Sequence, residues 1–172
     1  MKKELLIITA TILLCCSAML AQSTCDDLFV DFKKGTINGL EPTVEMDEVK
    51  AKLPCFTGET EENTRGMNCG GGVFYLKHYF NIYTKDDFIR IRKNFKGKFS
   101  KPVYNESRET VLKKLGKPDA ESEYKDAWLG TTTLILQYQK KWGVLSLMIN
   151  DGLVSSIEMH HGKKIADVDY CF

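Results

Sequence analysis

The sequence predicts an α+β protein made of two tandem units, each a short helix followed by an antiparallel β-meander. A short pattern of glycine, an apolar residue, valine and leucine occurs twice, about 62 residues apart. Each copy leads into a stretch of alternating apolar and polar residues bounded by turn residues, which is typical of strands. The matched positions are Gly35, Ile37, Val49 and Leu53 in the first copy and Gly97, Phe99, Val111 and Leu115 in the second.

The first 21 residues have the features of a secretory signal peptide. Lys2 and Lys3 form a short positive start, and residues 5–14 are an apolar run too short to span a membrane. Small residues follow, and cleavage is expected just before Gln22. Leu14 precedes the first cysteine where a lipid anchor would need a small residue, so a cleaved leader is favoured over lipidation.

Removal of residues 1–21 leaves a chain without net charge. Lys2, Lys3 and Glu4 lie in that segment, so 22 basic and 22 acidic residues remain. This balance does not favour nucleic acid or another polyanion as a partner. No second apolar run is long enough to cross a membrane. We therefore expect a secreted or periplasmic protein, with one repeat at 22–96 and the other at 97–172.

Four cysteines remain after the leader: Cys25, Cys55, Cys69 and Cys171. An even number in an exported chain indicates two disulfides, and four cysteines allow three pairings. The preferred pairing is Cys55–Cys69, which closes one polar loop, together with Cys25–Cys171, which ties the chain ends. A closed loop of about 15 residues is worth roughly 3 kcal/mol. The spacing contains no C-x-x-C pair, so neither a metal nor another cofactor is expected.

In the first unit, a short strand or turn is expected around residues 28–32. Thr43 can cap a helix over about 44–53, which Pro54 would end. Residues 55–72 are polar and glycine-rich and predict a loop.

Two strands should follow that loop. Residues 73–83, VFYLKHYFNIY, alternate throughout and predict one strand, and residues 88–93 predict a second. The turn between them, Asp86-Asp87, corresponds to Asp151-Gly152 in the second copy, at an offset of 65.

The second unit has clearer boundaries. Ser107 or Asn105 can cap a helix that ends at Leu115, where Gly116 supplies the stop. Asp151 and the glycine after it tolerate the positive φ of a tight hairpin turn. Strands are expected at about 127–129, 132–139, 143–150 and 153–160.

The second predicted helix ends in Leu-Gly-Lys-Pro at residues 115–118, and a meander with aromatic residues follows it. This arrangement resembles two known groups. These are the beta-lactamase-inhibitory-protein-like and SmpA/OmlA-like folds, and the doubled unit is similar to the inhibitory protein. The resemblance implies a disulfide between the helix end and the first strand, here Cys55–Cys69. It also implies an inhibitor or immunity-type protein. The chain departs from the pattern in its shorter first meander and in lacking a second such disulfide.

The three histidines do not indicate catalysis. His78 lies within an alternating strand and suits a structural role. His160 and His161 would point to opposite faces of one strand, so they cannot easily share a metal, and a solvated end is the simplest interpretation. No pair of carboxylates suggests an acid and its base. We therefore expect no enzymatic activity.

A row of tyrosines is the strongest sign of a binding surface. In the predicted strand at 73–83 the tyrosines share one face with polar neighbours, and Tyr, Trp and Arg are common anchors of protein interfaces. The alternative is that they cover a second core layer. Basic residues at 90–101 favour a solvated linker between the copies, or a patch facing an acidic protein, over a site for single-stranded nucleic acid. The predicted partner-binding residues are Tyr75, Tyr79, Tyr83, Arg90, Arg92, Trp128 and Trp142.

The function expected from these features is binding to another protein, such as an exported enzyme or toxin. A rigid sheet face would present aromatic and arginine anchors to a groove on the target and so occlude it. The alternatives are a structural envelope factor of the SmpA/OmlA kind and an enzyme of unrecognised type.

Overall fold

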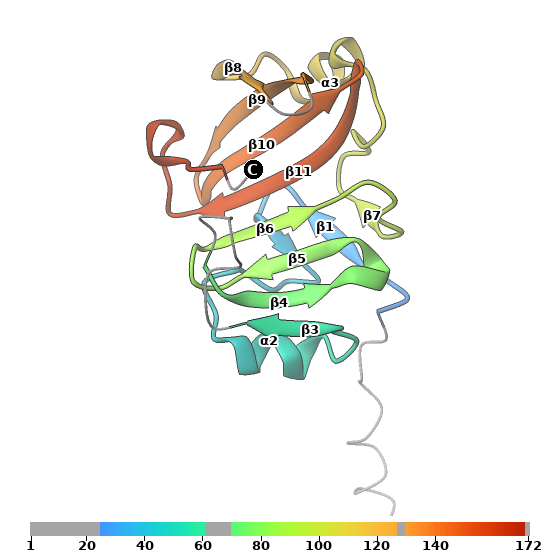
Figure 1. Ribbon diagram of the computed structural model, residues 1–172, viewed down its shortest axis with the longest axis vertical. Helices are drawn as coiled ribbons and strands as arrows, with labels where there is room; N and C mark the ends of the chain where they lie inside the picture. The colour runs from blue at the N-terminus through green and yellow to red at the C-terminus, as the bar shows by residue number, and fades with distance from the viewer. Residues whose placement is uncertain (1–24, 61–69, 127–129, 171–172) are drawn as a thin grey trace, which may run out of the picture.

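A computed structural model describes residues 25–60, 70–126 and 130–170. The predicted leader at 1–21 lies outside these residues. The large sheet faces the viewer in Figure 1, and β1 (Phe29–Asp31), the middle strand of a small three-stranded sheet, lies behind it. In chain order the elements are β1 (Phe29–Asp31), β2 (Thr36–Ile37), α2 (Met46–Lys52), β3 (Gly58–Thr60), β4 (Gly72–Tyr75), the 3₁₀ turn η2 (Leu76–His78), β5 (Phe80–Tyr83), β6 (Phe88–Ile91), β7 (Lys98–Phe99), α3 (Arg108–Leu115), β8 (Ala120–Lys125), β9 (Thr132–Lys140), β10 (Gly143–Asn150), β11 (Leu153–His161) and η3 (Ile165–Asp167).

The large sheet has eight strands in the order β3-β4-β5-β6-β11-β10-β9-β8, and every neighbouring pair is antiparallel. The last strands of the two predicted meanders, β6 and β11, pair with each other, with Ile91 opposite Ile157. The predicted α+β class of two helix-plus-meander units is therefore wrong. The protein is mostly β: among the described residues it has one eight-stranded sheet that joins both predicted meanders, a small three-stranded sheet and two short α-helices. An unpaired strand edge leaves N–H and C=O groups unsatisfied, so joining the two edges favours one sheet over two units.

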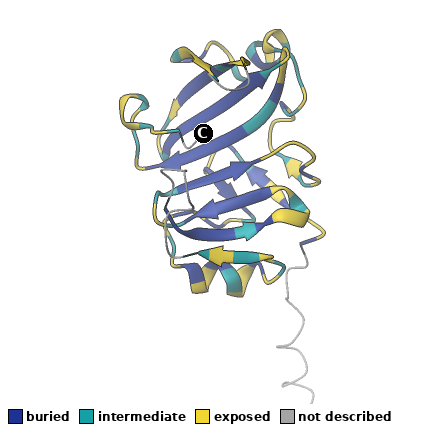
Figure 2. Cartoon of the chain, viewed as in Figure 1, coloured by how far each residue is buried: buried dark blue, intermediate teal, exposed yellow. Residues whose placement is uncertain are grey.

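The core lies between the large sheet and a layer formed by the small sheet and the helices. Alternate strand residues enter this core, whereas Tyr83 and Phe88 form a separate cluster on the second face of the sheet. Figure 2 shows the central strands as buried, while the edge strand β8 is largely exposed. The core includes Val30, Ile37, Val49, Val73, Ile82, Ile89, Val111, Leu136, Leu147 and Ile157.

The predicted strand at 73–83 is wrong, because the chain reverses in its middle. β4 and β5 form a hairpin in which Tyr75 lies opposite Phe80, and the turn between them contains η2. Tyr79 adopts a left-handed conformation with φ of 62°. The core residues are Val73 and Tyr75 in β4 but Phe80 and Ile82 in β5, so the turn shifts the alternation by one residue. Neither a glycine nor a proline marks this shift in the sequence.

Several local predictions are confirmed. Ser107 caps α3 by accepting a hydrogen bond from the Thr110 backbone N–H, and Gly116 follows the helix with φ of 86°. The turn residues Asp87 and Asp151 both have positive φ. The first helix also forms, but it begins at residue 46, and its cap residue makes no side-chain capping bond, so the prediction of Thr43 as cap is wrong. Residues 127–129, predicted as a strand, lie outside the described residues.

The disulfide joins Cys25 to Cys55, with 6.2 Å between the Cα atoms. The preferred pairings, Cys55–Cys69 and Cys25–Cys171, are therefore wrong. Cys69 and Cys171 themselves lie outside the described residues. The preference rested on sequence separation, whereas pairing requires Cα atoms within about 7 Å of each other. Here the end of α2 brings Cys55 next to the start of the small sheet.

Loss of this disulfide should cost substantial stability. The bridge spans a sequence separation of 30. Closure of a loop of that size is worth about 3–4 kcal/mol in the chain-entropy model. We expect the double variant Cys25→Ala/Cys55→Ala to lose about that much free energy of unfolding in urea titrations. Reduction of the wild-type protein should give a similar loss, and recovery of a Cys55–Cys69 peptide under non-reducing conditions would contradict the assignment.

Candidate functional site

The predicted tyrosine row does not form one surface, because the hairpin separates its members. Tyr75 is fully buried on the core face, where its hydroxyl donates to the Leu53 carbonyl at 3.0 Å and burial raises its pKa. Tyr83 is buried on the second face and stacks on Phe88 at 4.3 Å. Tyr79 alone of the three is exposed, to 37%.

The other predicted binding residues are also divided between surfaces. Arg90 is buried on the second face of the sheet, next to Tyr83, whereas Arg92 is exposed just beyond β6. Trp142 packs on the core side, where its indole N–H donates to the Phe32 carbonyl at 3.1 Å. Trp128 lies outside the described residues. Of the predicted set, the described structure thus leaves Tyr79 and Arg92 available to a partner.

Tyr79 belongs to an exposed apolar group at the turn between β4 and β5. Leu76 is 59% exposed and Phe56, on the neighbouring loop, is 38% exposed. The Leu76 N–H donates to the Thr57 hydroxyl at 2.9 Å, which holds the two loops side by side. We call Phe56, Leu76, Tyr79 and Arg92 the hairpin tip. Figure 2 shows this turn, at the right-hand end of β4 and β5, as exposed.

Covalent and hydrogen-bonded contacts hold the hairpin tip in place. The Thr57 N–H and hydroxyl both donate to the Phe74 carbonyl, at 2.7 and 3.0 Å. The Arg92 N–H donates to the Tyr79 carbonyl at 2.8 Å. The disulfide at Cys55 anchors the loop that carries Phe56. A bulky residue with positive φ, such as Tyr79, persists only where the surroundings determine its conformation, and such residues are concentrated at functional sites.

The surroundings of the hairpin tip are mainly basic. Lys77, Arg92, Lys93 and Lys96 are all exposed there. A cavity of about 190 Å³ lies beside the turn and is lined in part by Lys77, Lys96 and Asp26. Among the described residues, this end of the sheet therefore combines apolar side chains with a positive local charge.

His78 lies next to the disulfide, so its surroundings bear on metal binding. One nitrogen of His78 and the sulfur atoms of Cys25 and Cys55 lie within 4.8 Å of one another. The two sulfur atoms are bonded to each other, and a metal needs the thiolate form. In the oxidised protein we therefore assign no metal to this group. His78 belongs to the 3₁₀ turn, so the prediction that it lies within a strand is wrong.

The second face of the sheet holds a buried ionic network that sequence reasoning missed. Glu158 is fully buried and accepts from Arg90 Nε at 2.5 Å. The second oxygen of its carboxylate lies 2.8 Å from His160 Nε2. Because an ionised carboxylate can only accept, His160 carries its proton on Nε2. Burial opposes the charge of Glu158, but Arg90 and His160 outweigh this effect and hold the pKa of Glu158 below its usual value.

Aromatic rings enclose this network. Phe88 stacks on His160 at 5.0 Å, and the Arg90 guanidinium lies 5.5 Å from the centre of the Phe88 ring. The Tyr170 ring meets His160 edge-on, and its hydroxyl lies 2.8 Å from the Ser146 hydroxyl. Burial raises the pKa of Tyr170 to about 12. The groups of this network satisfy one another, but Arg90 and Glu158 also line a cavity of about 200 Å³, so the network is buried without being closed off from the surface.

The predicted solvated end at His160 and His161 is wrong, because both rings are buried. Their predicted placement on opposite faces is confirmed: His160 contacts Glu158, whereas His161 Nε2 lies 2.7 Å from the Gly35 carbonyl on the core side. The alternation of Ile157 and Met159 into the core could have shown that Glu158 and His160 share the other face.

Comparison of the chain with protein families, with curated proteins and with solved structures finds no match. Across the described residues, no helix combines the length and apolarity needed to cross a membrane. The function is therefore inferred from the geometry of the chain itself.

Proposed function

We propose that this protein is a non-enzymatic binding module that attaches to another protein through the hairpin tip and occludes a groove on it. The exposure of Phe56, Leu76 and Tyr79 together on one braced turn is the observation that carries the proposal. Structural disulfides occur mainly in oxidising compartments, which fits the predicted leader and an exported partner. Occlusion of a groove would inhibit the partner, which agrees with the inhibitor or immunity-type role that the resemblance implies.

The hairpin tip suits binding because little of it has to become ordered. Association costs free energy when mobile side chains and loops are immobilised, and a preformed loop reduces that cost. The bonds from Thr57 to the β4 end and the disulfide at Cys55 already restrain the backbone here. Tyrosine and arginine, present at Tyr79 and Arg92, are enriched among the residues that dominate binding energies.

The local charge defines the partner's chemistry. Lys77, Lys93 and Lys96 are exposed around the apolar side chains. Complementary potentials accelerate association and exclude wrong partners. The partner surface is therefore an apolar groove with an acidic rim, and the association rate should fall as ionic strength rises.

Site-specific photo-crosslinking can test this surface. A photoreactive phenylalanine analogue at Tyr79 should crosslink a single partner from the protein's own cell envelope or medium. The matched control is Tyr124, which is equally exposed at 36% but lies on the edge strand β8. Crosslinking of the same protein with equal yield from both positions would contradict the proposal.

Binding of the purified partner then measures the contribution of the tip. We expect Leu76→Ser or Tyr79→Asn to raise the Kd by at least about 30-fold, which corresponds to an anchor worth about 2 kcal/mol. Asparagine tolerates the left-handed conformation at position 79, so the melting temperature should stay near that of the wild type. An unchanged Kd in both variants would show that the partner binds elsewhere.

A further inference from the structure

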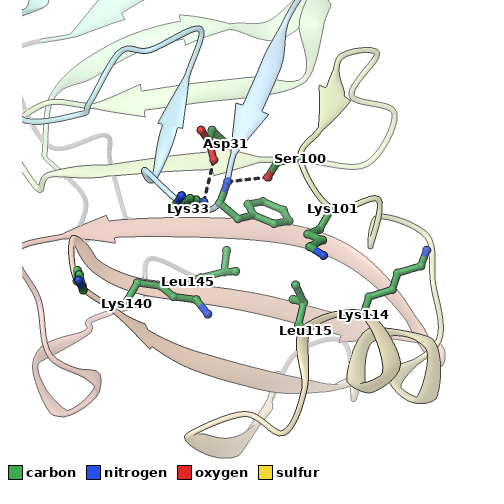
Figure 3. A pocket seen from close by; sticks show the side chains of 10 residues that line it. Asp31, Lys33, Ser100, Lys101, Lys114, Leu115, Lys140 and Leu145 are labelled. Carbon is green, nitrogen blue, oxygen red and sulfur yellow. Dashed lines mark hydrogen bonds between the residues drawn. The ribbon is translucent and has the colours of Figure 1, made fainter.

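A separate cavity of about 690 Å³ lies between the small sheet, the end of α3 and the hairpin of β9 and β10 (Figure 3). Pockets that hold small molecules are typically about 300–1,000 Å³. None of the hairpin-tip residues lines it. A ligand here would therefore not depend on the surface proposed above for the partner protein.

The interior of this cavity is apolar. Phe32 comes from the end of the small sheet, Leu115 from the last residue of α3, and Leu145 from β10. Figure 3 shows Leu115 and Leu145 pointing into the same space. Leu145 and Phe32 are otherwise buried in the core, so the cavity reaches down to core side chains.

The rim is strongly basic. Lys33, Lys101, Lys114, Lys140 and Lys141 line the cavity, and Asp31 is the acidic residue among the described lining residues. The Asp31 carboxylate accepts from the backbone N–H of Lys33 at 2.8 Å.

The lysines differ in how far they are already paired. Lys114 pairs with Glu106 at 2.8 Å, and the Lys140 ammonium lies 5.2 Å from the centre of the Tyr138 ring. Lys33, Lys101 and Lys141 have no carboxylate partner within residues 25–60, 70–126 and 130–170. The cavity rim therefore concentrates positive charge that the described chain leaves uncompensated.

We infer that this cavity binds the anion of a single-chain fatty acid. The apolar interior accepts a hydrocarbon chain, whose burial is favourable by about 25 cal/mol per Å². The lysine ammonium groups at the rim would receive the carboxylate while their methylene stems cover the chain. A concave cavity of this size encloses one small amphiphile, whereas attachment to a lipid bilayer would need a flat or protruding apolar surface.

Titration calorimetry with monomeric dodecanoate tests the ligand class. We expect one bound dodecanoate per chain. Dodecanol, which lacks the charge, and inorganic phosphate, which lacks the apolar chain, should both bind more weakly. Phosphate binding as tight as dodecanoate would show a plain anion site. Association with anionic phosphatidylglycerol vesicles, without binding of free dodecanoate, would show a membrane surface instead. Either result would overturn the inference.

Charge-reversal variants locate the site. Lys33→Glu/Lys101→Glu/Lys141→Glu should weaken dodecanoate binding by at least about 10-fold. The matched control is Lys77→Glu/Lys93→Glu/Lys96→Glu, which changes the net charge by the same amount beside the hairpin tip. It should alter the affinity for dodecanoate by less than about 2-fold. Equal losses in both variants would mean that overall charge, and not this cavity, attracts the anion.

A third variant tests the apolar part separately. Leu115 is half-buried at the end of its helix, so Leu115→Gln should leave the protein folded. We expect it to weaken dodecanoate binding and leave phosphate binding unchanged. Unchanged dodecanoate binding in a folded Leu115→Gln variant would contradict the proposed place of the hydrocarbon chain. The cavity variants at Lys33, Lys101, Lys141 and Leu115 lie away from the hairpin tip. Binding of the protein partner should therefore persist in them, and the two proposals can fail independently.

Discussion

Replacing Glu158 with alanine is expected to destabilise the protein by about 3–5 kcal/mol at neutral pH, because it removes the carboxylate that balances the buried charge of Arg90. The Arg90 guanidinium is nearly fully buried and donates to Glu158 at 2.5 Å. His160 would also lose its acceptor at 2.8 Å. Chemical denaturation, with the free energy of unfolding extrapolated to water, measures this loss.

The double variant Arg90→Met/Glu158→Met is the control. Replacing a buried ion pair by apolar residues of similar volume is often neutral or stabilising, because neither charge then has to be desolvated. We therefore expect the double variant to be more stable than Glu158→Ala. Similar losses of stability in both variants would show that side-chain volume, and not the charge balance between Arg90 and Glu158, determines the effect.

The same network gives the protein a characteristic acid sensitivity. The folded protein holds the pKa of Glu158 below its usual value, through Arg90 and His160 and against the effect of burial. The ionised carboxylate therefore contributes stability that is fully present above the unfolded pKa, about 4.3. This contribution is lost as the pH falls through the lower folded pKa. Between neutral pH and this acidic range, the free energy of unfolding of Glu158→Gln should fall less than that of the wild type. The same dependence of this free energy on pH in both proteins would contradict the role given to Glu158.

Gly143→Ala is expected to have a similarly large effect, at least about 4 kcal/mol, or to prevent folding. Gly143 opens β10 with φ of 149°, and an added Cβ would lie 1.9 Å from the His160 carbonyl oxygen. That oxygen belongs to the neighbouring strand β11, so the clash could be relieved only by separating β10 from β11 near the centre of the sheet. Circular dichroism and thermal unfolding measure the outcome.

Gly39→Ala provides the matched comparison. Gly39 also has positive φ, 76°, but an added Cβ would meet nothing within 4 Å. Its cost should be limited to the left-handed backbone, about 1–2 kcal/mol. If Gly143→Ala and Gly39→Ala lower the free energy of unfolding by the same amount, then the backbone conformation, and not the contact with β11, makes Gly143 necessary.

Part of the candidate site was predictable from the sequence. Tyr79 and Arg92 were identified because tyrosine and arginine are common at interfaces. Leu76 was missed because the alternation of residues 73–83 places it among the apolar core positions of one continuous strand. The turn at residues 76–79 has neither glycine nor proline, and Tyr79 itself adopts the positive φ. Only the pairing of Tyr75 with Phe80 shows that the chain reverses there.

The sequence by itself determined the features that depend on neighbouring residues. The Ser107 cap, the glycine after α3 and the Asp151 turn each follow from the conformational preferences of a few adjacent residues. The tertiary structure decided the pairing of β6 with β11 and of Cys25 with Cys55. Both join segments far apart in the chain, and their partners depend on which strand edges and which Cα atoms packing brings together. For the same reason Glu158, an ordinary charged residue in the sequence, became the buried centre of an ionic network.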